Sequence, residues 1–251
     1  MAKVIAITNH KGGVGKTTSV ATIGCALARM GKRVLLMDLD AQSNLTSFFL
    51  SDPEESGLSV YDSLTKGAAL PVKEIKENLS IVPASLELAR VELDLLSRIA
   101  RETILKKLLD PVKEAYDYVL IDCPPYLGIV VTNALVAADE VIIPLTAEAL
   151  PLQGLSVLED VIDEVREGVN DKLTINGVLL TRYNRRSLNK EVLQAVETHF
   201  GEKVYATKIR EDIRLAEVPV SGGDIFEYFP KCHGAEDYKA VAEEIVARSG
   251  K

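Results

Sequence analysis

Residues 11–18 read Lys-Gly-Gly-Val-Gly-Lys-Thr-Thr, between an apolar run at residues 4–8 (Val-Ile-Ala-Ile-Thr) and a helix-compatible segment, Ser19–Met30. The stretch fits the phosphate-binding pattern G-x-x-x-x-G-K-[ST] in a compressed register, with an additional lysine at its front. In such a loop, backbone N–H groups surround a phosphate at a helix N-terminus, where the helix dipole also favours an anion. A strand, this loop and a helix in that order predict a P-loop with a nucleotide as its ligand.

The residue types of this loop each have a chemical role. Glycine leaves room for the backbone to approach the phosphate and allows positive φ. We expect Lys16 to reach the β- and γ-phosphates and the Thr17 hydroxyl to ligate Mg²⁺. The loop residues predicted to bind the nucleotide are Lys11, Gly12, Gly13, Val14, Gly15, Lys16, Thr17 and Thr18.

The overall composition is that of a globular α/β protein. The chain has 251 residues, 47% apolar and 26% charged, which suits a single domain over residues 1–251. No apolar stretch approaches the roughly 20 residues of a membrane span. The three cysteines are far apart and show no metal-ligand spacing. We expect no signal peptide and a reducing, cytoplasmic compartment.

The charge is unevenly distributed along the chain. The net charge is −8, which by itself argues against a nucleic-acid partner. The segment from Arg182 to Arg214, however, has eight basic and five acidic residues, a net charge of +3. This segment is compatible with a polyanion-binding surface and equally with a solvated helix face.

Apolar β-branched runs alternate with helix-like segments, and this predicts an open, doubly wound, mostly parallel sheet with helices on both faces. The expected strands are Lys3–Thr8, Arg33–Asp38, Ser80–Val82, Tyr118–Asp122, Glu140–Pro144, Thr174–Thr181 and Lys203–Tyr205. The expected helices are Lys16–Met30, Leu86–Ala100, Ile104–Glu114, Ile129–Ala137, Gly154–Glu167, Leu188–His199 and Ala235–Arg248. Residues 51–76 are the least regular stretch.

Aspartates stand where ligands bind in such sheets, at the carboxyl ends of strands. Asp122 follows an apolar strand and precedes Cys123-Pro124-Pro125, which is the Walker B position that helps to hold Mg²⁺. Its alternative role is to cap the next helix. No glutamate follows Asp122, so Asp40 is the candidate for orienting the attacking water, or else a supporting or helix-capping residue. The predicted metal-binding residues are Thr17, Asp38 and Asp122, and the predicted catalytic residues are Lys11, Lys16 and Asp40.

The loop, the Asp-x-Asp-x-Gln segment at residues 38–42 and the Asp-Cys-Pro-Pro segment together resemble the ParA/MinD family of P-loop ATPases. Within it, the chain is most similar to the ParA (Soj-type) branch of chromosome and plasmid partition ATPases. Residues 42–46 (Gln-Ser-Asn-Leu-Thr), 213–219 (Ile-Arg-Leu-Ala-Glu-Val-Pro) and 234–238 (Gly-Ala-Glu-Asp-Tyr) carry that resemblance.

The resemblance implies a slow, Mg²⁺-dependent ATP hydrolase whose ATP-bound form is a homodimer. Lys11 would then reach the nucleotide of the partner subunit. The dimer would bind DNA without sequence preference on the nucleoid, and a ParB-like protein would stimulate hydrolysis. The residues implied at the DNA are Arg185, Arg186 and Arg214, and those implied beside the adenine are Arg210 and Asp212.

The chain departs from the family pattern at two places. Ala41 stands where proline is usual, and residues 209–212 read Ile-Arg-Glu-Asp where the family usually has Ile-Pro-Arg-Asn. The second departure puts acids beside the expected adenine site and weakens the local basic character.

Three other functions compete with this interpretation. A MinD-like membrane ATPase would end in a basic amphipathic helix, whereas the polar face of residues 235–248 is acidic and would be repelled by anionic lipid. An iron-protein-type reductase needs paired cysteines, and Cys123 has no suitable second cysteine. A ParA-like positioner of non-DNA cargo remains open. We therefore expect no membrane partner.

Overall fold

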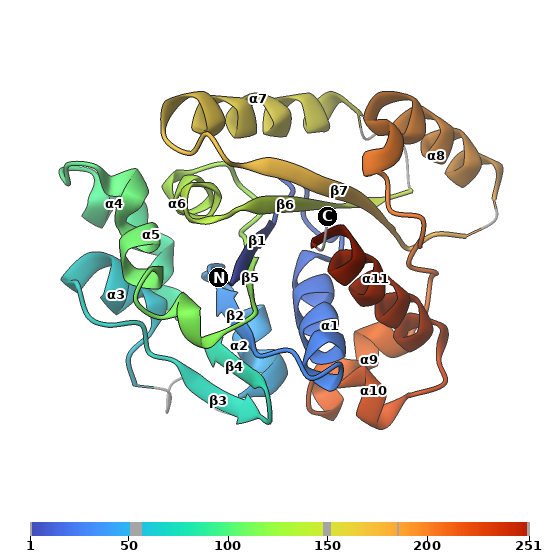
Figure 1. The fold of residues 1–251 in the computed structure, drawn as a ribbon, viewed down its shortest axis with the longest axis horizontal. Coiled ribbons are helices and arrows are strands. Elements are labelled where there is room, and N and C mark those ends of the chain that lie inside the picture. The colour runs from blue at the N-terminus through green and yellow to red at the C-terminus, as the bar shows by residue number, and fades with distance from the viewer. Residues whose placement is uncertain (1, 51–56, 148–151, 185, 250–251) are drawn as a thin grey trace.

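The computed structural model describes residues 2–50, 57–147, 152–184 and 186–249. Within these residues a seven-stranded sheet has the order β3-β4-β2-β5-β1-β6-β7 (Figure 1). Every neighbouring pair is parallel except β3 and β4, which are antiparallel. The strands are β1 Lys3–Ile7, β2 Val34–Asp38, β3 Lys73–Lys76, β4 Leu79–Val82, β5 Tyr118–Asp122, β6 Glu140–Thr146 and β7 Thr174–Thr181.

The central strands are apolar except at their ends, because both of their faces are buried. In β1, Val4 and Ala6 belong to one hydrophobic cluster, whereas Ile5 and Ile7 belong to the other. The same alternation holds in β2 and β5, since successive side chains of a strand point to opposite faces. Helices must therefore cover both faces of the sheet.

The helices divide accordingly into two layers (Figure 1). Buried residues of α3 to α8 join the first cluster, and those of α1, α2, α9, α10 and α11 join the second. The α-helices are α1 Lys16–Arg29, α2 Asn44–Phe49, α3 Val60–Lys66, α4 Val91–Leu95, α5 Ile104–Leu109, α6 Ile129–Ala137, α7 Leu152–Gly168, α8 Ser187–Phe200, α9 Arg214–Ser221, α10 Ile225–Tyr228 and α11 His233–Ser249. The 3₁₀ helices are η2 Leu86–Arg90, η3 Arg101–Thr103, η4 Lys113–Ala115 and η5 Gly201–Lys203.

The predicted fold class, a doubly wound and mostly parallel sheet, is confirmed. One expected strand is wrong: residues 203–205 contribute an isolated bridge from Val204 to Val178 in place of a strand, directly after η5. The irregular stretch contains α3, whose start is fixed by a capping box between Ser59 and Asp62, and the edge strand β3. Residues 51–56 of that stretch lie outside the described residues.

The strand order explains where a ligand can bind. Strands β2, β5, β1, β6 and β7 are neighbours, so the loops at their carboxyl ends meet along one edge of the sheet. Asp38 and Asp122 are register partners on β2 and β5, and Asp122 is also the partner of Ile7 on β1. No helix among the described residues is long and apolar enough to span a bilayer.

Candidate nucleotide site

The phosphate-binding loop has the backbone shape that its glycines permit. Gly13 and Gly15 adopt φ of 74° and 84°, a left-handed conformation that side chains with a Cβ rarely occupy. Helix α1 begins at the next residue, Lys16. The loop therefore leads directly into the N-terminus of α1. The N-cap residue Gly15 has no side chain to cap the N–H groups of the first turn, so these groups can bind an anion.

Two buried side chains hold this loop against the neighbouring strands. Asn9 donates from Nδ2 to the carbonyl of Pro144 at 2.8 Å and accepts at Oδ1 from the amide of Lys11 at 3.0 Å. Thr181, at the end of β7, donates from Oγ1 to the carbonyl of Val14 at 2.9 Å. The loop is thus fixed from β6 and β7 before any ligand arrives.

The two lysines of the loop have different surroundings. Lys16 is buried, and its Nζ donates to the carbonyl of Lys11 at 3.2 Å. Burial lowers the pKa of Lys16, although Asp122, Cys123 and Asp40 counter part of this fall. The Lys11 side chain is exposed and has no hydrogen-bond or ion-pair partner among the described residues. Lys16 therefore faces inward to the loop, and Lys11 is available at the surface.

Asp122 is a fully buried carboxylate whose two oxygens, among the described residues, accept no hydrogen bond of normal geometry. Burial, and next the neighbouring Asp38, raise the pKa of Asp122 well above its usual value, while Thr17 and Lys16 oppose the rise. The Thr8 hydroxyl is also buried without a hydrogen bond of normal geometry among the described residues. A buried carboxylate that accepts no hydrogen bond of normal geometry is stabilised when a further cation or hydrogen-bond donor binds beside it.

This geometry fits Mg²⁺. The described residues contain no cluster of three or more His, Cys, Asp or Glu side chains that would form an all-protein metal cage. Mg²⁺ beside a nucleotide is usually held by one or two protein oxygens, with phosphate oxygens and water completing the shell. The Thr17 hydroxyl and the orphaned Asp122 carboxylate are suited to that role.

Asp38 differs from Asp122 although both are fully buried. Its Oδ2 accepts from the amide and the hydroxyl of Thr46 at 2.8 and 2.7 Å, and its Oδ1 accepts from the amide of Asp40 at 3.1 Å. Burial raises the pKa of Asp38 to about 6, although these hydrogen bonds oppose the rise. Asp38 already organises the start of α2, so its assignment to the metal stays a prediction.

Asp40 lies half-buried on the turn that Asp38 fixes. Its Oδ1 accepts from the amide of Gln42 at 2.9 Å, and the other oxygen makes no hydrogen bond among the described residues. It lies close enough to Lys16 and Asp122 to influence the pKa of both. One free carboxylate oxygen at this place is compatible with orienting a water molecule.

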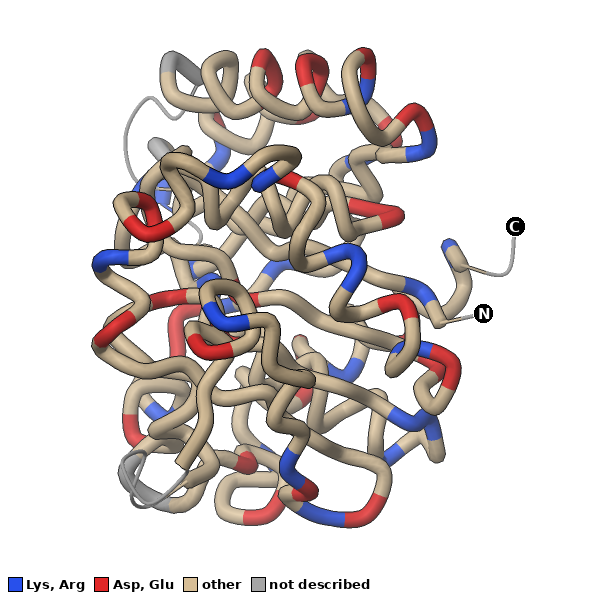
Figure 2. The backbone as a smooth tube through the Cα atoms, turned by 90° about the vertical axis from the view of Figure 1, so that its left-hand side faces the viewer, with Lys and Arg blue, Asp and Glu red and all other residues tan. Residues whose placement is uncertain are grey.

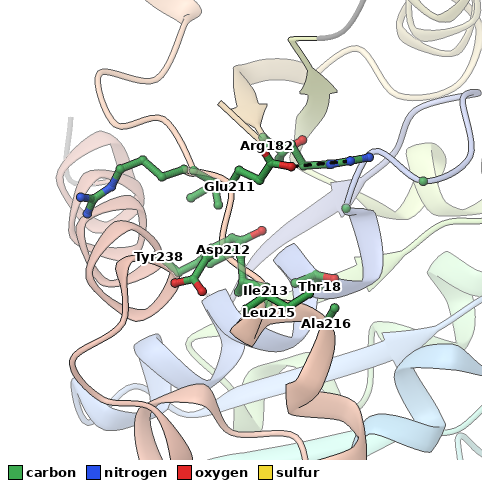
Figure 3. Close-up of a pocket in the computed structure, with 13 residues that line it drawn as sticks. Thr18, Arg182, Glu211, Asp212, Ile213, Leu215, Ala216 and Tyr238 are labelled. Atoms are coloured by element: carbon green, nitrogen blue, oxygen red, sulfur yellow. Dashed lines mark ion pairs between the residues drawn. The ribbon is translucent and has the colours of Figure 1, made fainter. Parts of the chain in front are cut away.

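A cavity of ≈ 370 Å³ extends from the loop toward the surface (Figure 3). Thr18 and Tyr238 line it beside the apolar side chains of residues 209–216. Arg182 and Glu211 stand at one rim and form an ion pair at 4.0 Å. An apolar slot beside a phosphate loop suits a nucleobase, and Arg210 and Asp212, both predicted there, line it.

The charged groups of Arg210 and Asp212 pair with groups of the protein itself. The Arg210 guanidinium pairs with Asp237 at 2.7 Å and with Glu236 at 3.0 Å, both on α11. The Asp212 carboxylate accepts from the amides of Arg214 and Gly234 at 3.0 and 2.9 Å. Burial alone would raise the pKa of Asp212, but these hydrogen bonds lower it. These side chains therefore shape the wall of the cavity.

Of the residues expected at DNA, the structure describes Arg186 and Arg214. Arg185 lies outside the described residues. Arg186 is exposed and caps α8, and Arg214 begins α9, where it pairs with Glu217 at 2.6 Å and stacks 4.9 Å from the Phe229 ring centroid. Both arginines can reach solvent, and their proposed DNA contacts stay predictions.

Sequence reasoning missed Asn9, Thr46, Thr181 and Arg182. Thr181 and Arg182 have a sequence signal, because the strand expected over Thr174–Thr181 ends there and ligands bind at the carboxyl ends of such strands. Arg182 has φ of 50°, a strained conformation for a non-glycine residue that is common at ligand sites. The role of Asn9 depends partly on the carbonyl of Pro144, 135 residues further along the chain, and that of Thr46 on Asp38, so neither role could be predicted from the local sequence.

The fold and site define a P-loop nucleoside triphosphatase with an additional front lysine. A protein-family model described as "AAA domain" matches residues 2–175. The chain is 44% identical to the sporulation initiation inhibitor protein Soj of Bacillus subtilis, over 98% of this chain and 99% of that protein. It is 40% identical to the chromosome partitioning protein ParA of Caulobacter vibrioides, over 98% and 94%.

A solved structure gives the same fold. Cobyrinic acid a,c-diamide synthase from Mycobacterium smegmatis, with bound ADP and magnesium, superposes with a TM-score of 0.88 at 35% identity, covering 100% of this chain and 97% of that one. The chain therefore belongs to the Soj and ParA family of partitioning ATPases. The resemblance inferred from the sequence is confirmed.

Proposed function

We propose that this protein is a ParA-type partition ATPase that binds ATP·Mg²⁺, dimerises around it and then holds DNA without sequence preference. The observation that carries the proposal is the orphaned charge at the phosphate end of the cavity. Lys16 and Asp122 are buried with few protein partners, and a Mg²⁺–triphosphate supplies the missing contacts of both.

Each residue at the phosphate end has a separate role in ATP hydrolysis. Lys16 neutralises the terminal phosphates, Thr17 and Asp122 hold the metal ion, and Asp40 orients the attacking water. When bound, Mg²⁺ withdraws charge from the transferring phosphate. Because no glutamate follows Asp122, water activation is weak and unstimulated hydrolysis is slow.

The exposed Lys11 makes hydrolysis depend on a second subunit. Its side chain is exposed and has no hydrogen-bond or ion-pair partner among the described residues. A lysine supplied in trans to the partner's nucleotide stabilises charge that develops in phosphoryl transfer. A ParB-like protein then stimulates turnover and releases the dimer from the nucleoid. Arg186 and Arg214, with Arg185, contact DNA phosphates.

The test is dimerisation and turnover of matched variants. Light scattering should show an ATP-dependent dimer for Asp40→Ala, which binds ATP but cannot orient water, and a monomer for Lys11→Ala with ATP. Lys11→Ala should bind a fluorescent ATP analogue like the wild type. A Lys11→Ala protein that dimerises and hydrolyses ATP normally would contradict the assignment of Lys11.

A further inference from the structure

Arg182 and Glu211 form an ion pair at the mouth of the nucleotide cavity (Figure 3). Nη2 of Arg182 lies 4.0 Å from Oε1 of Glu211, and the two side chains are 53% and 54% exposed. A pair this long and this exposed stabilises a fold very little. Acidic and basic residues are also interspersed elsewhere, as Figure 2 shows for the side of the molecule that is on the left in Figure 1. This pair is distinguished by its place, because both residues line the cavity.

The backbone holds Arg182 in a strained conformation between the two loops of the site. Its φ of 50° is in the left-handed region, which a residue with a long side chain adopts when its surroundings enforce it. On one side, Thr181 is hydrogen-bonded to the phosphate-binding loop. On the other side, Tyr183 donates to the carbonyl of Ile209 at 2.8 Å and accepts from the amide of Glu211 at 3.1 Å. These hydrogen bonds fix the position from which the Arg182 side chain leaves the backbone.

Glu211 is held so that one of its carboxylate oxygens pairs with Arg182. Its Oε2 accepts from Nδ2 of Asn184 at 3.4 Å, while its Oε1 is the atom nearest to the guanidinium. Residue 211 is also a position where the family usually has an arginine, and a second arginine there would repel Arg182. The acid at residue 211 therefore allows Arg182 to stay at the mouth of the cavity.

The two arginines that line the cavity are held differently. The Arg210 guanidinium is fastened to Asp237 and Glu236 on α11 at 2.7 and 3.0 Å, whereas the contact from Arg182 to Glu211 is 4.0 Å long. Much of the remaining wall is apolar, and its aliphatic residues are Ile209, Ile213, Leu215 and Ala216. A flat aromatic base in this cavity would meet these aliphatic side chains and, at the mouth, the guanidinium of Arg182. Proteins commonly bind bases by stacking them on guanidinium planes.

We propose that the Arg182 guanidinium stacks on the face of the bound nucleobase, and that Glu211 is the positioning residue that holds it there. A guanidinium is planar, and it is attracted to the face of an aromatic ring. The contact uses the face of the base and not its edge, so it strengthens binding without adding a hydrogen bond to the base. The inference rests on the ATP binding that the proposed function includes, and it does not depend on dimerisation or on DNA.

The test compares two ligands that differ in the base alone. Isothermal titration calorimetry with Mg²⁺ should show that Arg182→Ala binds ATP about three- to tenfold more weakly than the wild type, because one cation–π contact is lost. Ribose 5′-triphosphate has the same sugar and phosphates, and its affinity should change by less than about twofold. Arg166→Ala on α7 is the control, since Arg166 pairs with Asp163 at 2.8 Å and is 44% exposed. This control should bind both ligands like the wild type.

Arg182→Gly separates the side chain from its strained backbone. Glycine adopts φ of 50° without strain, so this variant should melt at or above the temperature of Arg182→Ala. Its ATP affinity should nevertheless equal that of Arg182→Ala, because both variants lack the guanidinium. Wild-type affinity in Arg182→Gly would overturn the proposal, since the shape of the backbone alone would then matter. Equal losses for ATP and ribose 5′-triphosphate would also overturn it, because Arg182 would then contact the sugar or the phosphates. A wild-type protein that binds no ATP would instead refute the proposed function.

A double-mutant cycle tests the role of Glu211. Glu211→Gln keeps an acceptor for Asn184 but removes the charge that holds Arg182, and it should weaken ATP binding about threefold. In an Arg182→Ala background the same substitution should change ATP affinity by less than about 1.5-fold, because the group that it positions is already absent. An undiminished effect of Glu211→Gln in that background would show that Glu211 acts on the nucleotide itself, and it would overturn the positioning role.

Discussion

The two ends of the nucleotide cavity satisfy their charges in opposite ways. At the phosphate end, the Lys16 ammonium donates to a single carbonyl oxygen, and the Asp122 carboxylate accepts no hydrogen bond of normal geometry among the described residues. At the base end, Arg210 makes ion pairs to two acids of α11, and Asp212 accepts two amide hydrogen bonds. Charged side chains therefore have few protein partners at the phosphate end, whereas Arg210 and Asp212 at the base end are fully paired.

The number of protein partners distinguishes residues that bind the nucleotide from residues that stabilise the fold around it. A buried charge without partners destabilises the free protein, and it is retained when a ligand supplies the missing contacts. A charged side chain that is fully paired within the fold stabilises the wall of the cavity. We therefore expect substitutions at the phosphate end to affect turnover strongly, and those at the base end to affect stability and affinity mildly.

The largest effect should come from Lys16→Ala. Because Lys16 is the buried cation of the loop, its loss should lower ATP turnover by at least about 100-fold, as removal of one strong electrostatic donor commonly does. A coupled assay of phosphate release with saturating DNA and activator measures this. Lys16→Ala with ATP affinity and turnover like the wild type would remove the basis of the comparison.

Asp122→Asn should separate activity from stability. We expect turnover to fall about 10- to 100-fold, because a metal ligand is lost. The nucleotide-free protein should nevertheless melt at a higher temperature, by about 2–4 °C for each kcal/mol gained. Since the pKa of Asp122 is raised in the fold, its cost is absent below the unfolded-state pKa and grows as the pH rises, so the difference should be larger at pH 8 than at pH 5.

Asp38→Asn is the matched control for that experiment. Asp38 is equally buried, but its two oxygens accept three hydrogen bonds, which an amide cannot all accept. This variant should lose about 1–3 kcal/mol of stability. Melting curves of the two variants in EDTA, without nucleotide, would contradict the comparison if both moved in the same direction.

The sequence predicted the parallel sheet and most of the phosphate end because both have strong local patterns. Continuous apolar strands and a glycine loop depend on few distant contacts. Helices α3, α9 and α10 were missed because they are short, and α9 contains Pro219, which is unusual within a helix. Strand β3 was missed because its sequence, Lys-Glu-Ile-Lys, is polar and suits an exposed antiparallel edge.

The base end could be predicted only in part. The resemblance located residues 210 and 212 at the cavity, but it could not show that their side chains turn toward α11. Those directions depend on Asp237 and Gly234, more than 20 residues further along the chain. Similarly, the exposure of Leu93 and Leu96 could not be predicted, because apolar residues fill both faces of the helix expected over residues 86–100.

A smaller effect is expected at the surface beside the base end. Arg214→Ala should reduce the slope of log affinity for DNA against log salt by about 0.9, without affecting the ATP-dependent dimer. Arg166 on α7 is a matched control, because it forms a similar i,i+3 pair with Asp163 at 2.8 Å and is similarly exposed. Equal slopes for Arg214→Ala and Arg166→Ala would show that Arg214 does not touch DNA.

The smallest effect should come from Asp237→Asn. It weakens the ion pair that holds Arg210, and we expect about 1 kcal/mol of lost stability and a rise in the KM for ATP of about two- to fivefold, with kcat unchanged. Glu236→Gln, at the exposed partner, should change stability by less than about 0.5 kcal/mol. A large fall in kcat for Asp237→Asn would mean that the base end takes part in chemistry.

The most direct test of the proposed function is DNA binding by Asp40→Ala, with ATP·Mg²⁺ against ADP·Mg²⁺, on unrelated duplexes across a salt series. We predict binding that requires ATP, ignores sequence and falls steeply with salt. Absence of binding in both nucleotide states would contradict a DNA-partition function. Liposome sedimentation would then test the MinD-like alternative.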